Sequence, residues 1–379
     1  MAEPLGTKKH TLVDHLMGEG GLHAHVEGEY DHDHDHDDIG GYDLENDALW
    51  QQDHITLVSV GIDIGSSGTQ VIFSRVYMRR LSEELTSRYF VVKRETLHQS
   101  PVALTPYQSE TRIDERAVGD IVDAAYTAAG IHPDQIDTGA VILTGEALRR
   151  ENAKAIADVL AEMGGEFVCA AAGHHMESML AAYGSGAAKA SHDLGRPVLN
   201  VDIGGGTTKL ALVEQGRVVH TAAIHIGGRL VVVDRGSPSP LGEGRGGGQI
   251  TRLDPAGKQL AKNAGFDWNV GDSVSGEDLD RLAEWMADAL VAALTRSPTP
   301  RPVDALWLTD PLEPVEGIAG AMFSGGVAEY VYGREERDFG DLGRRFGHAV
   351  RRRIDARRLP WDLLPAGECI RATAIGASE

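Results

Sequence analysis

The sequence predicts an α/β protein built from two similar halves. Two observations carry this prediction: a short pattern that occurs twice, about 140 residues apart, and an alternation of strand-like with helix-like segments. The first copy, GIDIGSSGTQVIF, holds Asp63, and the second, NVDIGGGTTKLAL, holds Asp202. Each copy reads as an apolar strand, Asp-Ile-Gly, a tight turn of small residues and a second apolar strand, which is typical of a β-hairpin. A hairpin followed by helices, repeated along one chain, predicts an internal duplication.

The first half is expected to span residues 55–196. After the hairpin, residues 88–96 (RYFVVKRET) predict a third strand, because they are rich in aromatic and β-branched residues. Residues 114–129 place apolar side chains at helical spacing and predict a helix. The remaining elements are expected in this order: a strand at 140–144, a helix at 146–163 that ends at a pair of glycines, a strand at 167–170, and a helix rich in small residues at 174–188.

The second half is expected to span residues 197–339, with residues 340–379 returning to the first half. Its hairpin continues through LALVEQG and RVVHTAAIHI, and the Gly- and Pro-rich segment 235–248 predicts a surface loop. Residues 277–294 predict a long amphipathic helix whose apolar stripe faces the core. A strand is expected at 305–308, followed later by the glycine turn of MFSGGVAEY.

The first 54 residues predict a polar, disordered tail. They hold 14 Asp and Glu against two Lys, and so carry twelve of the 21 net negative charges of the chain. Residues 30–38 read YDHDHDHDD, and alternating Asp and His can bind Zn2+, Ni2+ or Co2+ loosely. A solvated tail with only adventitious metal affinity is the favoured interpretation.

Composition bounds the class of function. The acidic balance argues against nucleic acid as a partner, and no run of about 18 apolar residues predicts a membrane span. Cys169 and Cys369 are far apart and suit a reducing compartment, and the acidic, His-rich start does not read as a secretory signal. A cytoplasmic location is therefore expected. Residues 344–358 hold seven Arg and predict a solvated helix face or a patch that docks an acidic partner.

Two such hairpins facing each other would form a clamp for phosphate and metal. Bare backbone amides in the turns can bind phosphate oxygens, and the two carboxylates can hold a hydrated Mg2+. The pattern is not a P-loop, because GxxxxGK[ST] does not occur, and GxGxxG is missing after both strands.

The two hairpins, the small-residue helix before the second one and the later glycine turn together resemble the actin, sugar-kinase and heat-shock-chaperone ATPase superfamily. That resemblance implies two similar α/β domains that close over ATP and Mg2+. Residues 63–69 and 202–208 resemble the two phosphate hairpins, and residues 324–329 resemble the adenosine-binding turn. The resemblance implies Asp63 and Asp202 as catalytic and metal-binding residues. It implies nucleotide contacts from Gly65, Ser66, Ser67, Gly68, Thr69, Gly204, Gly205, Gly206, Thr207, Thr208, Gly325, Gly326 and Glu329.

Several separated blocks narrow the resemblance. LTGEALRRENA, the AAGHHMES helix, LNVDIGGGTTKLAL and IHIGGRLVVVD resemble the EutA family of ethanolamine ammonia-lyase reactivating factors, from about Ile55 to the end of the chain. The resemblance implies an ATP-dependent chaperone that releases damaged cobalamin from the adenosylcobalamin-dependent lyase, so that intact cofactor can rebind. Reactivation of a diol or glycerol dehydratase, a small-molecule kinase and a filament-forming actin relative stay open as alternatives. Homo-oligomerisation and association with a bacterial microcompartment stay open as well.

Three departures from the superfamily pattern limit the expected activity. Where heat-shock chaperones carry an acidic residue in the first connecting helix, this chain has His175, and helical geometry is expected to turn Glu177 away from that face. No Lys follows the first Asp-x-Gly, and Gln70 and Ser74 stand nearby instead, so slow hydrolysis is expected. The chain ends at AIGASE, at the expected second connecting helix (371–377), where reactivating factors normally continue.

Overall fold

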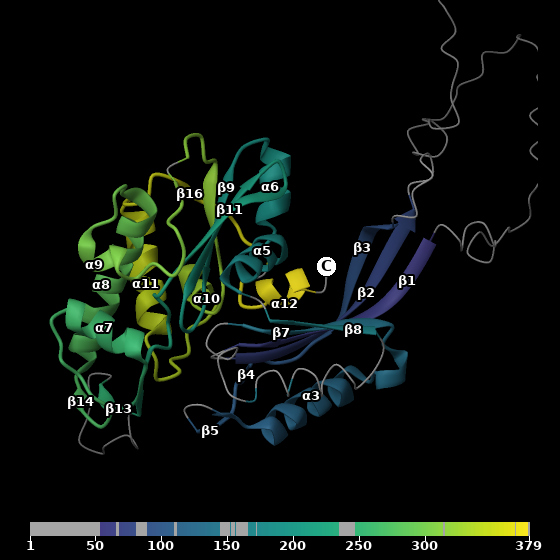
Figure 1. Ribbon diagram of the computed structural model, residues 1–379, viewed down its shortest axis with the longest axis horizontal. Helices are drawn as coiled ribbons and strands as arrows, with labels where there is room; N and C mark the ends of the chain where they lie inside the picture. The colour runs from purple at the N-terminus through teal and green to yellow at the C-terminus, as the bar shows by residue number, and fades with distance from the viewer. Residues whose placement is uncertain are drawn as a thin grey trace, which may run out of the picture. The chain divides into compact units, whose positions relative to one another are not determined.

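Two β-sheets with the same strand order form the framework of the protein (Figure 1). The computed structural model describes residues 54–65, 68–80, 89–109, 112–144, 152, 156, 166–171, 173–234, 247–313, 315–367 and 369–377. The predictions for the acidic tail and its His/Asp run, for nearly all of the helix at 146–163 and for most of the loop at 235–248 lie outside these residues.

The first sheet has the order β3-β2-β1-β7-β8, with β4 beside β2. β1 and β2 form the predicted antiparallel hairpin, and β1 and β7 run parallel. A separate two-stranded sheet pairs β5 with β6. The strands are β1 (His54–Ile64), β2 (Gly68–Arg80), β3 (Tyr89–Gln99), β4 (Ala103–Leu104), β5 (Tyr107–Ser109), β6 (Arg112–Ile113), β7 (Thr138–Leu143) and β8 (Glu166–Ala171).

The second sheet has the order β11-β10-β9-β15-β16, and it repeats the first. Its hairpin pairs β9 with β10 antiparallel, and β9 runs parallel to β15. Every residue of β9 is buried, as expected for a central strand covered on both faces. The strands are β9 (Val198–Ile203), β10 (Thr208–Glu214), β11 (Arg217–Ile224), β15 (Gly320–Ser324) and β16 (Asp362–Leu363), and a smaller sheet holds β12 (Val231–Asp234), β13 (Gly248–Leu253) and β14 (Ser273–Val274). The repeated order confirms the predicted α/β class with two duplicated halves.

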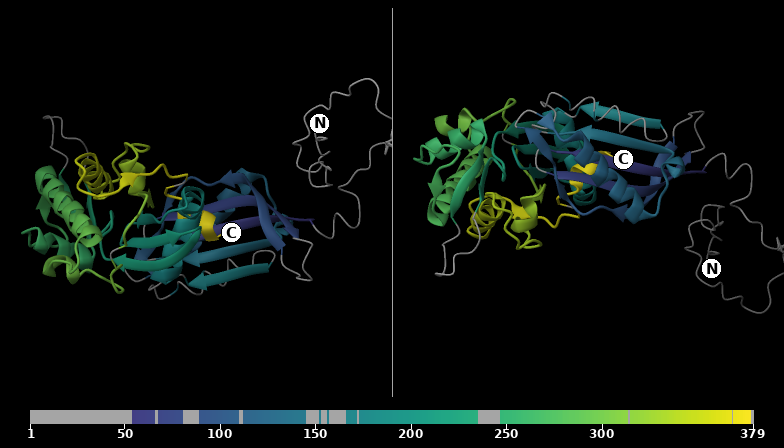
Figure 2. Two further views of the ribbon diagram at one scale, coloured as in Figure 1. Left: turned by 90° about the horizontal axis from the view of Figure 1, so that it is seen from above. Right: turned by 90° about the horizontal axis from the view of Figure 1, so that it is seen from below.

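Helices cover the faces of both sheets (Figures 1 and 2). α3 packs on β2 and β3 of the first sheet, and Asp114 caps its first turn by accepting a hydrogen bond from the backbone N–H of Ala117. The helices are α3 (Glu115–Ala129), α5 (His174–Gly184), α6 (Ala187–Leu194), α7 (Pro255–Asn263), α8 (Gly276–Thr295), α9 (Arg301–Asp304), α10 (Ala328–Val331), α11 (Gly343–Asp355) and α12 (Ala372–Ala377), with a short 3-10 helix, η2 (Pro133–Gln135). None of the helices in the described residues is both long and apolar enough to cross a membrane.

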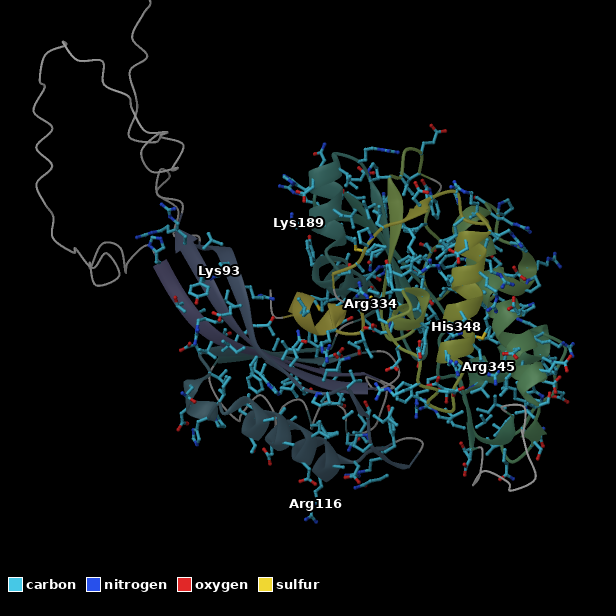
Figure 3. All side chains as sticks on the ribbon, turned by 180° about the vertical axis from the view of Figure 1, so that it is seen from behind. Lys93, Arg116, Lys189, Arg334, Arg345 and His348 are labelled. Carbon is cyan, nitrogen blue, oxygen red and sulfur yellow. The ribbon has the colours of Figure 1, made fainter. Side chains whose placement is uncertain are left out.

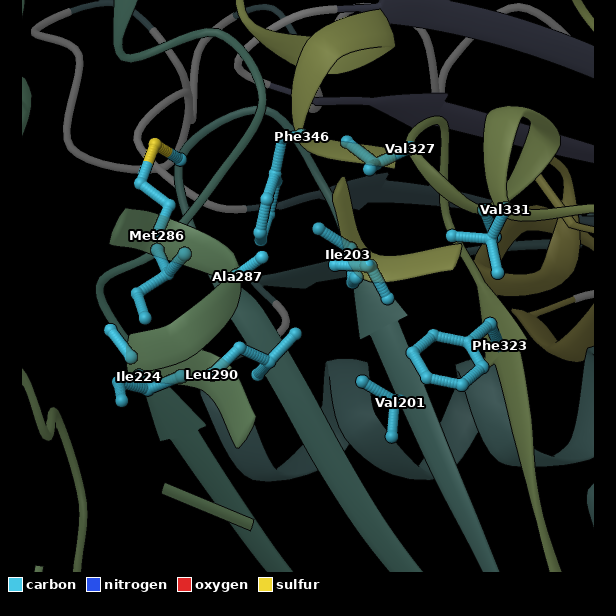
Figure 4. Close-up of a cluster of buried hydrophobic side chains, with 14 of the residues drawn as sticks. Val201, Ile203, Ile224, Met286, Ala287, Leu290, Phe323, Val327, Val331 and Phe346 are labelled. Carbon is cyan, nitrogen blue, oxygen red and sulfur yellow. The ribbon is translucent and has the colours of Figure 1, made fainter. Parts of the chain in front are cut away.

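The core of the second half lies between its sheet and α8 (Figure 4). α8 confirms the predicted amphipathic helix, and its buried stripe includes Leu279, Leu282 and Met286. Removing such large side chains from water contributes about 1.5–3 kcal/mol each. The labelled side chains in Figure 4 that meet in this core are Val201, Ile203, Ile224, Met286, Ala287, Leu290, Phe323, Val327, Val331 and Phe346.

α5 and α12 cross each other between the two sheets. α5 packs on β9, β10 and β11, and α12 packs on β1, β2 and β7. The crossing is close because each helix presents a glycine. A Cβ built at Gly184 would lie 1.8 Å from the carbonyl oxygen of Ala372, and one at Gly376 would lie 2.0 Å from that of Leu180. The small-residue pattern of these helices therefore permits backbone contact where the halves meet.

α11 packs along α8 through arginines. Arg345 pairs with Asp280 of α8, Arg352 pairs with Glu284, and Arg353 pairs with both Glu284 and Asp288. These three arginines therefore pair with acidic side chains of α8 in the same chain. The segment 340–379 thus divides: α11 and β16 lie with the second sheet, and α12 lies against α5 and the first sheet.

Two predicted elements differ from the structure. The helix expected at 174–188 ends at Gly184, and α6 starts at Ala187 after Gly186, whose φ of 89° favours glycine and breaks the helix. The strand expected at 305–308 was wrong. Proline starts α9 just before it, and the segment then makes only a single β-bridge, between Trp307 and Ile224. The strand before the glycine turn is β15.

Candidate functional site

Asp63 and Asp202 occupy equivalent places in the two hairpins. Each lies near the end of the central strand, beside a parallel strand whose end supplies a hydroxyl donor. Thr144, directly after β7, donates to Oδ1 of Asp63 at 3.0 Å, and Ser324, at the end of β15, donates to Oδ1 of Asp202 at 2.8 Å. Because the chain repeats the hairpin and its neighbouring strand, it also repeats the hydroxyl that orients each carboxylate.

The two carboxylates line one pocket of about 520 Å3. This volume falls in the range of about 300–1,000 Å3 that is typical of sites for small molecules and cofactors. Both hairpin turns, the glycine turn after β15 and the loop before α12 contribute to its wall. Its lining includes Asp63, Gly65, Gly68, Gln70, Thr144, Glu177, Asp202, Gly204, Gly205, Lys209, Arg229, Gly325, Gly326, Glu329, Tyr330, Arg334, Arg337, Phe339, Asp341 and Ile370.

A buried ion pair between Glu177 and Lys209 forms part of the pocket wall. Glu177 lies in the first turn of α5, and Lys209 lies in β10, directly opposite Asp202 in the hairpin register. Both side chains are at most 6% exposed, so their charges depend on each other and on the two aspartates. Oε2 of Glu177 is buried without a hydrogen-bond partner and is available to a bound molecule.

Burial raises the pKa of both aspartates. The pKa of Asp63 rises to about 7, first because of burial and second because of the negative charge of Glu177, although the hydrogen bond from Thr144 opposes the rise. Burial also raises the pKa of Asp202, to about 6, and the positive charge of Lys209 opposes this rise. Burial alone would lower the pKa of Lys209, but the surrounding carboxylates, Glu177 foremost, raise it overall. Ionised carboxylates here are costly until a cation joins them.

The structure brings most of the predicted site residues to this pocket. Asp63, Gly65, Gly68, Asp202, Gly204, Gly205, Gly325, Gly326 and Glu329 line it. Ser66 and Ser67 lie outside the described residues. Four others stand behind the lining: Thr69, Gly206, Thr207 and Thr208.

The hydroxyls of Thr69 and Thr208 bond within the protein. Thr69 Oγ1 lies 3.1 Å from Thr105 Oγ1, and Thr208 Oγ1 donates to the carbonyl oxygen of Ile226 at 2.7 Å. Both side chains are fully buried, so these threonines shape the hairpin turns from behind. Both residues lie at the start of the second strand of their hairpin.

Gly325 lets the third turn approach the second hairpin. Its φ is 84°, and a Cβ at this position would lie 2.4 Å from the carbonyl oxygen of Ile203. Only glycine fits both conditions, which explains the SGG pattern after β15. The carboxylate of Glu329 accepts a hydrogen bond from the backbone N–H of Ile370 at 3.1 Å, so this turn also holds the segment before α12.

The sequence reasoning missed Glu177 and Lys209. Glu177 and His175 do lie on different faces of α5, as expected, but the face that carries Glu177 is the one that lines the pocket. His175 points elsewhere, and its Nδ1 lies 2.6 Å from Thr221 Oγ1 of β11. A signal for Lys209 was present: it stands seven residues after Asp202, as Gln70 stands seven after Asp63, and each pairs with its aspartate across the hairpin.

The outer wall of the pocket is richer in charge than the sequence suggested. Arg229 pairs with Asp341 at 3.1 Å, and burial raises the pKa of Asp341. The guanidinium of Arg337 lies over the ring of Phe339, 5.1 Å from its centroid, and this ring is 46% exposed. Flat apolar and cationic groups together can receive an aromatic ring of a bound molecule.

The residues present fit a hydrated divalent cation and phosphate groups. The described residues contain no group of three or more His, Cys, Asp or Glu that could hold a metal directly, so a cation between the two carboxylates would keep much of its water, as Mg2+ does. Oε1 of Gln70 and Oε2 of Glu177 are both buried without a hydrogen-bond partner in the pocket wall. Orphaned polar atoms of this kind are costly unless a ligand or water satisfies them.

Fold and site together define a duplicated α/β protein with one acidic hairpin from each half at a shared pocket. The family model described as "Ethanolamine utilisation protein EutA" matches residues 55–379, and the chain belongs to this family. It is 34% identical over 325 residues to the ethanolamine ammonia-lyase reactivases EutA of Salmonella typhimurium and Escherichia coli, covering 85% of this chain and 66% of theirs. The chain thus spans about two thirds of the length of these curated relatives. The ethanolamine utilization protein EutJ from Carboxydothermus hydrogenoformans is similar at 15% identity, with a TM-score of 0.40, over 86% of this chain and 89% of that one.

Proposed function

We propose that this chain is a nucleotide-dependent chaperone that reactivates ethanolamine ammonia-lyase by releasing damaged cobalamin from it. The observation that carries the proposal is the pocket into which two equivalent Asp hairpins converge, in a chain of the EutA family. The relatives named as reactivases of this lyase support it over a diol or glycerol dehydratase. A cytoplasmic site of action, with or without a microcompartment, belongs to the same proposal.

The hairpins would act as the nucleotide clamp. We assign the backbone of Gly65, Gly68, Gly204 and Gly205 to the phosphates, and the turn at Gly325 and Gly326 to the nucleoside end. Asp63 and Asp202, oriented by their hydroxyl donors, would hold the water shell of Mg2+. Bound Mg2+ would neutralise phosphate charge, which phosphoryl transfer chiefly requires.

Glu177 is the group that we assign to the water. Its Oε1 is fixed by Lys209, and its Oε2 has no hydrogen-bond partner, so we assign it to accept a hydrogen bond from a water beside the terminal phosphate. Lys209 would add positive charge from the second hairpin, where the first offers only neutral Gln70.

The crossing of α5 and α12 would transmit the nucleotide state. α5 carries Glu177 in its first turn and Gly184 at its end, where it contacts α12. A nucleotide that contacts both hairpins favours a closed arrangement, and loss of the terminal phosphate removes part of that preference. Two arrangements that bind the lyase differently could loosen its hold on the damaged cofactor.

The test uses the chain with inactivated lyase, ATP, Mg2+ and fresh adenosylcobalamin. Recovery of deaminase activity is expected only with all components present. Asp202→Ala should lose both recovery and binding of a fluorescent ATP analogue, while Asp267→Asn, an exposed acid outside the pocket, should keep both. Retention of both by Asp202→Ala would defeat the site assignment, and nucleotide binding without any recovery would defeat the choice of partner.

A further inference from the structure

A second hollow lies beside α11, and none of its lining residues is among those assigned to the nucleotide. It measures about 190 Å3 and is lined by Asp280, Asp338, Arg344, Arg345, His348 and Arg352. Figure 3 labels Arg345 and His348 on this helix. A water occupies about 30 Å3 in the liquid, so the hollow has room for a few water-sized groups but not for a nucleotide.

Arg344, His348 and Arg352 follow each other at four-residue spacing, and so lie on one face of α11. Arg352 is held by Glu284 and Arg345 by Asp280, both from α8. Arg344 differs from them, because its guanidinium has no hydrogen bond or ion pair within the part of the chain that the structure describes; its Nε, like that of Arg345, is buried without a hydrogen-bond partner. A guanidinium N–H in this state favours an oxygen acceptor from outside the chain.

The surroundings of His348 are electrically positive. Burial lowers the pKa of His348, and the charges of Arg344 and Arg352 on either side lower it further. The rings of Tyr330 and His348 pack perpendicular to each other, with 6.1 Å between their centroids. The acids of the wall, Asp280 and Asp338, do not reverse this effect.

We propose that this hollow is a binding site for a tetrahedral oxyanion of the phosphate type, held by Arg344 and His348 with Arg352 beside them. Arginine presents a planar fork of N–H donors that matches phosphate oxygens, and an ionised acceptor makes such bonds short and strong. A side-chain carboxylate of an acidic peptide shares the charge but offers fewer oxygens to three donors. The phosphate-type ion therefore fits the arrangement better, and the experiment separates the two.

Residues that line the hollow are neighbours in sequence of residues that line the proposed nucleotide pocket. Asp338 lines the hollow, whereas Phe339, Asp341 and Gly343 line the larger pocket. Gly343 directly precedes Arg344, and its backbone N–H donates a hydrogen bond to Oδ1 of Asp341 at 2.8 Å. An ion that orders Arg344 therefore acts on the first turn of α11 and on the wall of the nucleotide pocket.

The experiment follows the imidazole signals of the whole chain, labelled at histidine Cε1, by NMR, with His348→Gln to assign the signal. Inorganic phosphate is titrated against sodium chloride at equal ionic strength, which controls for screening. The His348 signal should shift to saturation with phosphate, and its pKa should rise, because the bound anion offsets the two arginines. A glutamate hexapeptide forms a second arm.

Arg344→Ala should weaken phosphate binding at least tenfold, since it removes a charge-assisted hydrogen bond. Arg357→Ala is the matched control: it removes the same charge from the exposed end of the same segment, outside the hollow. Unchanged thermal unfolding of both variants shows that the fold is kept. The proposal is overturned if phosphate shifts His348 no more than chloride does, if the two variants weaken binding equally, or if the hexapeptide binds more tightly than phosphate.

Discussion

The two hairpins of this chain share a backbone plan, but a different side chain stands opposite the aspartate in each. In both, an aspartate on the central strand faces, across the hairpin, the residue seven positions later. In the second hairpin that residue is Lys209, which pairs with Glu177. In the first it is Gln70, whose Nε2 donates to the carbonyl oxygen of Ile370 at 3.0 Å. Duplication thus preserved the carboxylates and separated the roles of their neighbours.

The difference sets the charge of each half of the site. Asp63 faces the neutral amide of Gln70 across its hairpin, and its pKa rises to about 7. Asp202 has a cation beside it, and its pKa rises only to about 6. At neutral pH the second aspartate is the more fully ionised one. In the proposed clamp, Asp63 is the carboxylate that a bound cation would have to ionise.

Lys209→Met should produce the largest effect on stability. Methionine keeps most of the volume, but Glu177 is then buried without its partner, and breaking a buried pair in this way costs about 3–5 kcal/mol. Gln70→Met, at the equivalent position, loses one ordinary hydrogen bond and should cost about 1 kcal/mol. Urea unfolding without nucleotide measures both free energies of unfolding.

The double variant Glu177→Gln with Lys209→Met is the control for this comparison. It removes both charges together and should recover most of the lost stability. Equal costs for Lys209→Met and Gln70→Met would show that the ion pair is not what distinguishes the second hairpin.

The sequence predicted the backbone of the site better than its charges. The hairpins, the glycine turn and the helix α8 have local signatures: small residues at tight turns and apolar residues at helical or strand spacing. The ion pair of Glu177 has no local signature, because it joins α5 to β10 and depends on how that helix is rotated over the sheet. The misplaced strand at 305–308 has a similar cause, since a short apolar run next to prolines is decided by tertiary contacts.

The difference in charge between the two hairpins predicts that a rise in pH changes ligand affinity and the stability of the ligand-free protein in opposite directions. A cation binds the ionised form of Asp63, so affinity for Mg2+ and ATP should fall as the pH drops below about 7, by up to about tenfold per pH unit. The folded pKa of Asp63 lies above its unfolded value of 3.8. The stability that this group contributes without ligand is therefore full below 3.8 and is lost as the pH rises through 7.

Gln70→Lys sharpens this test by giving the first hairpin the cation of the second. The new charge should lower the pKa of Asp63, and so move the fall in affinity to lower pH. Asp63→Asn should remove the part of the pH dependence of ligand-free stability that the titration of Asp63 causes. Binding of a fluorescent ATP analogue and thermal unfolding, both followed from pH 5 to pH 8, measure how affinity and ligand-free stability depend on pH. Identical midpoints for the wild type and Gln70→Lys would contradict the account.

The smallest effect concerns the hydroxyls that orient the two aspartates. Thr144→Val and Ser324→Ala each remove a hydrogen bond to an ionised carboxylate, and each should weaken binding of Mg2+ and ATP about tenfold. Their effects on stability should differ, because Thr144 bonds only Asp63 in this wall, whereas Ser324 also accepts a hydrogen bond from Asn200 Nδ2 at 3.1 Å. Asn200 in turn accepts from Ser185 at 2.9 Å, so the second hairpin has a buried chain of polar groups.

Ser324→Ala therefore leaves the amide of Asn200 buried without that partner, at a cost of about 1–3 kcal/mol, while Thr144→Val should cost less. Ser324→Thr, which keeps the hydroxyl, controls for the loss of the hydrogen bond in the second hairpin. Calorimetric titration with nucleotide and urea unfolding separate the two effects. If both variants lose affinity and stability in the same proportion, the hydroxyls support the fold alone. If affinity falls equally but only Ser324→Ala loses stability, the two halves share one way of orienting a carboxylate and differ in what stands behind it.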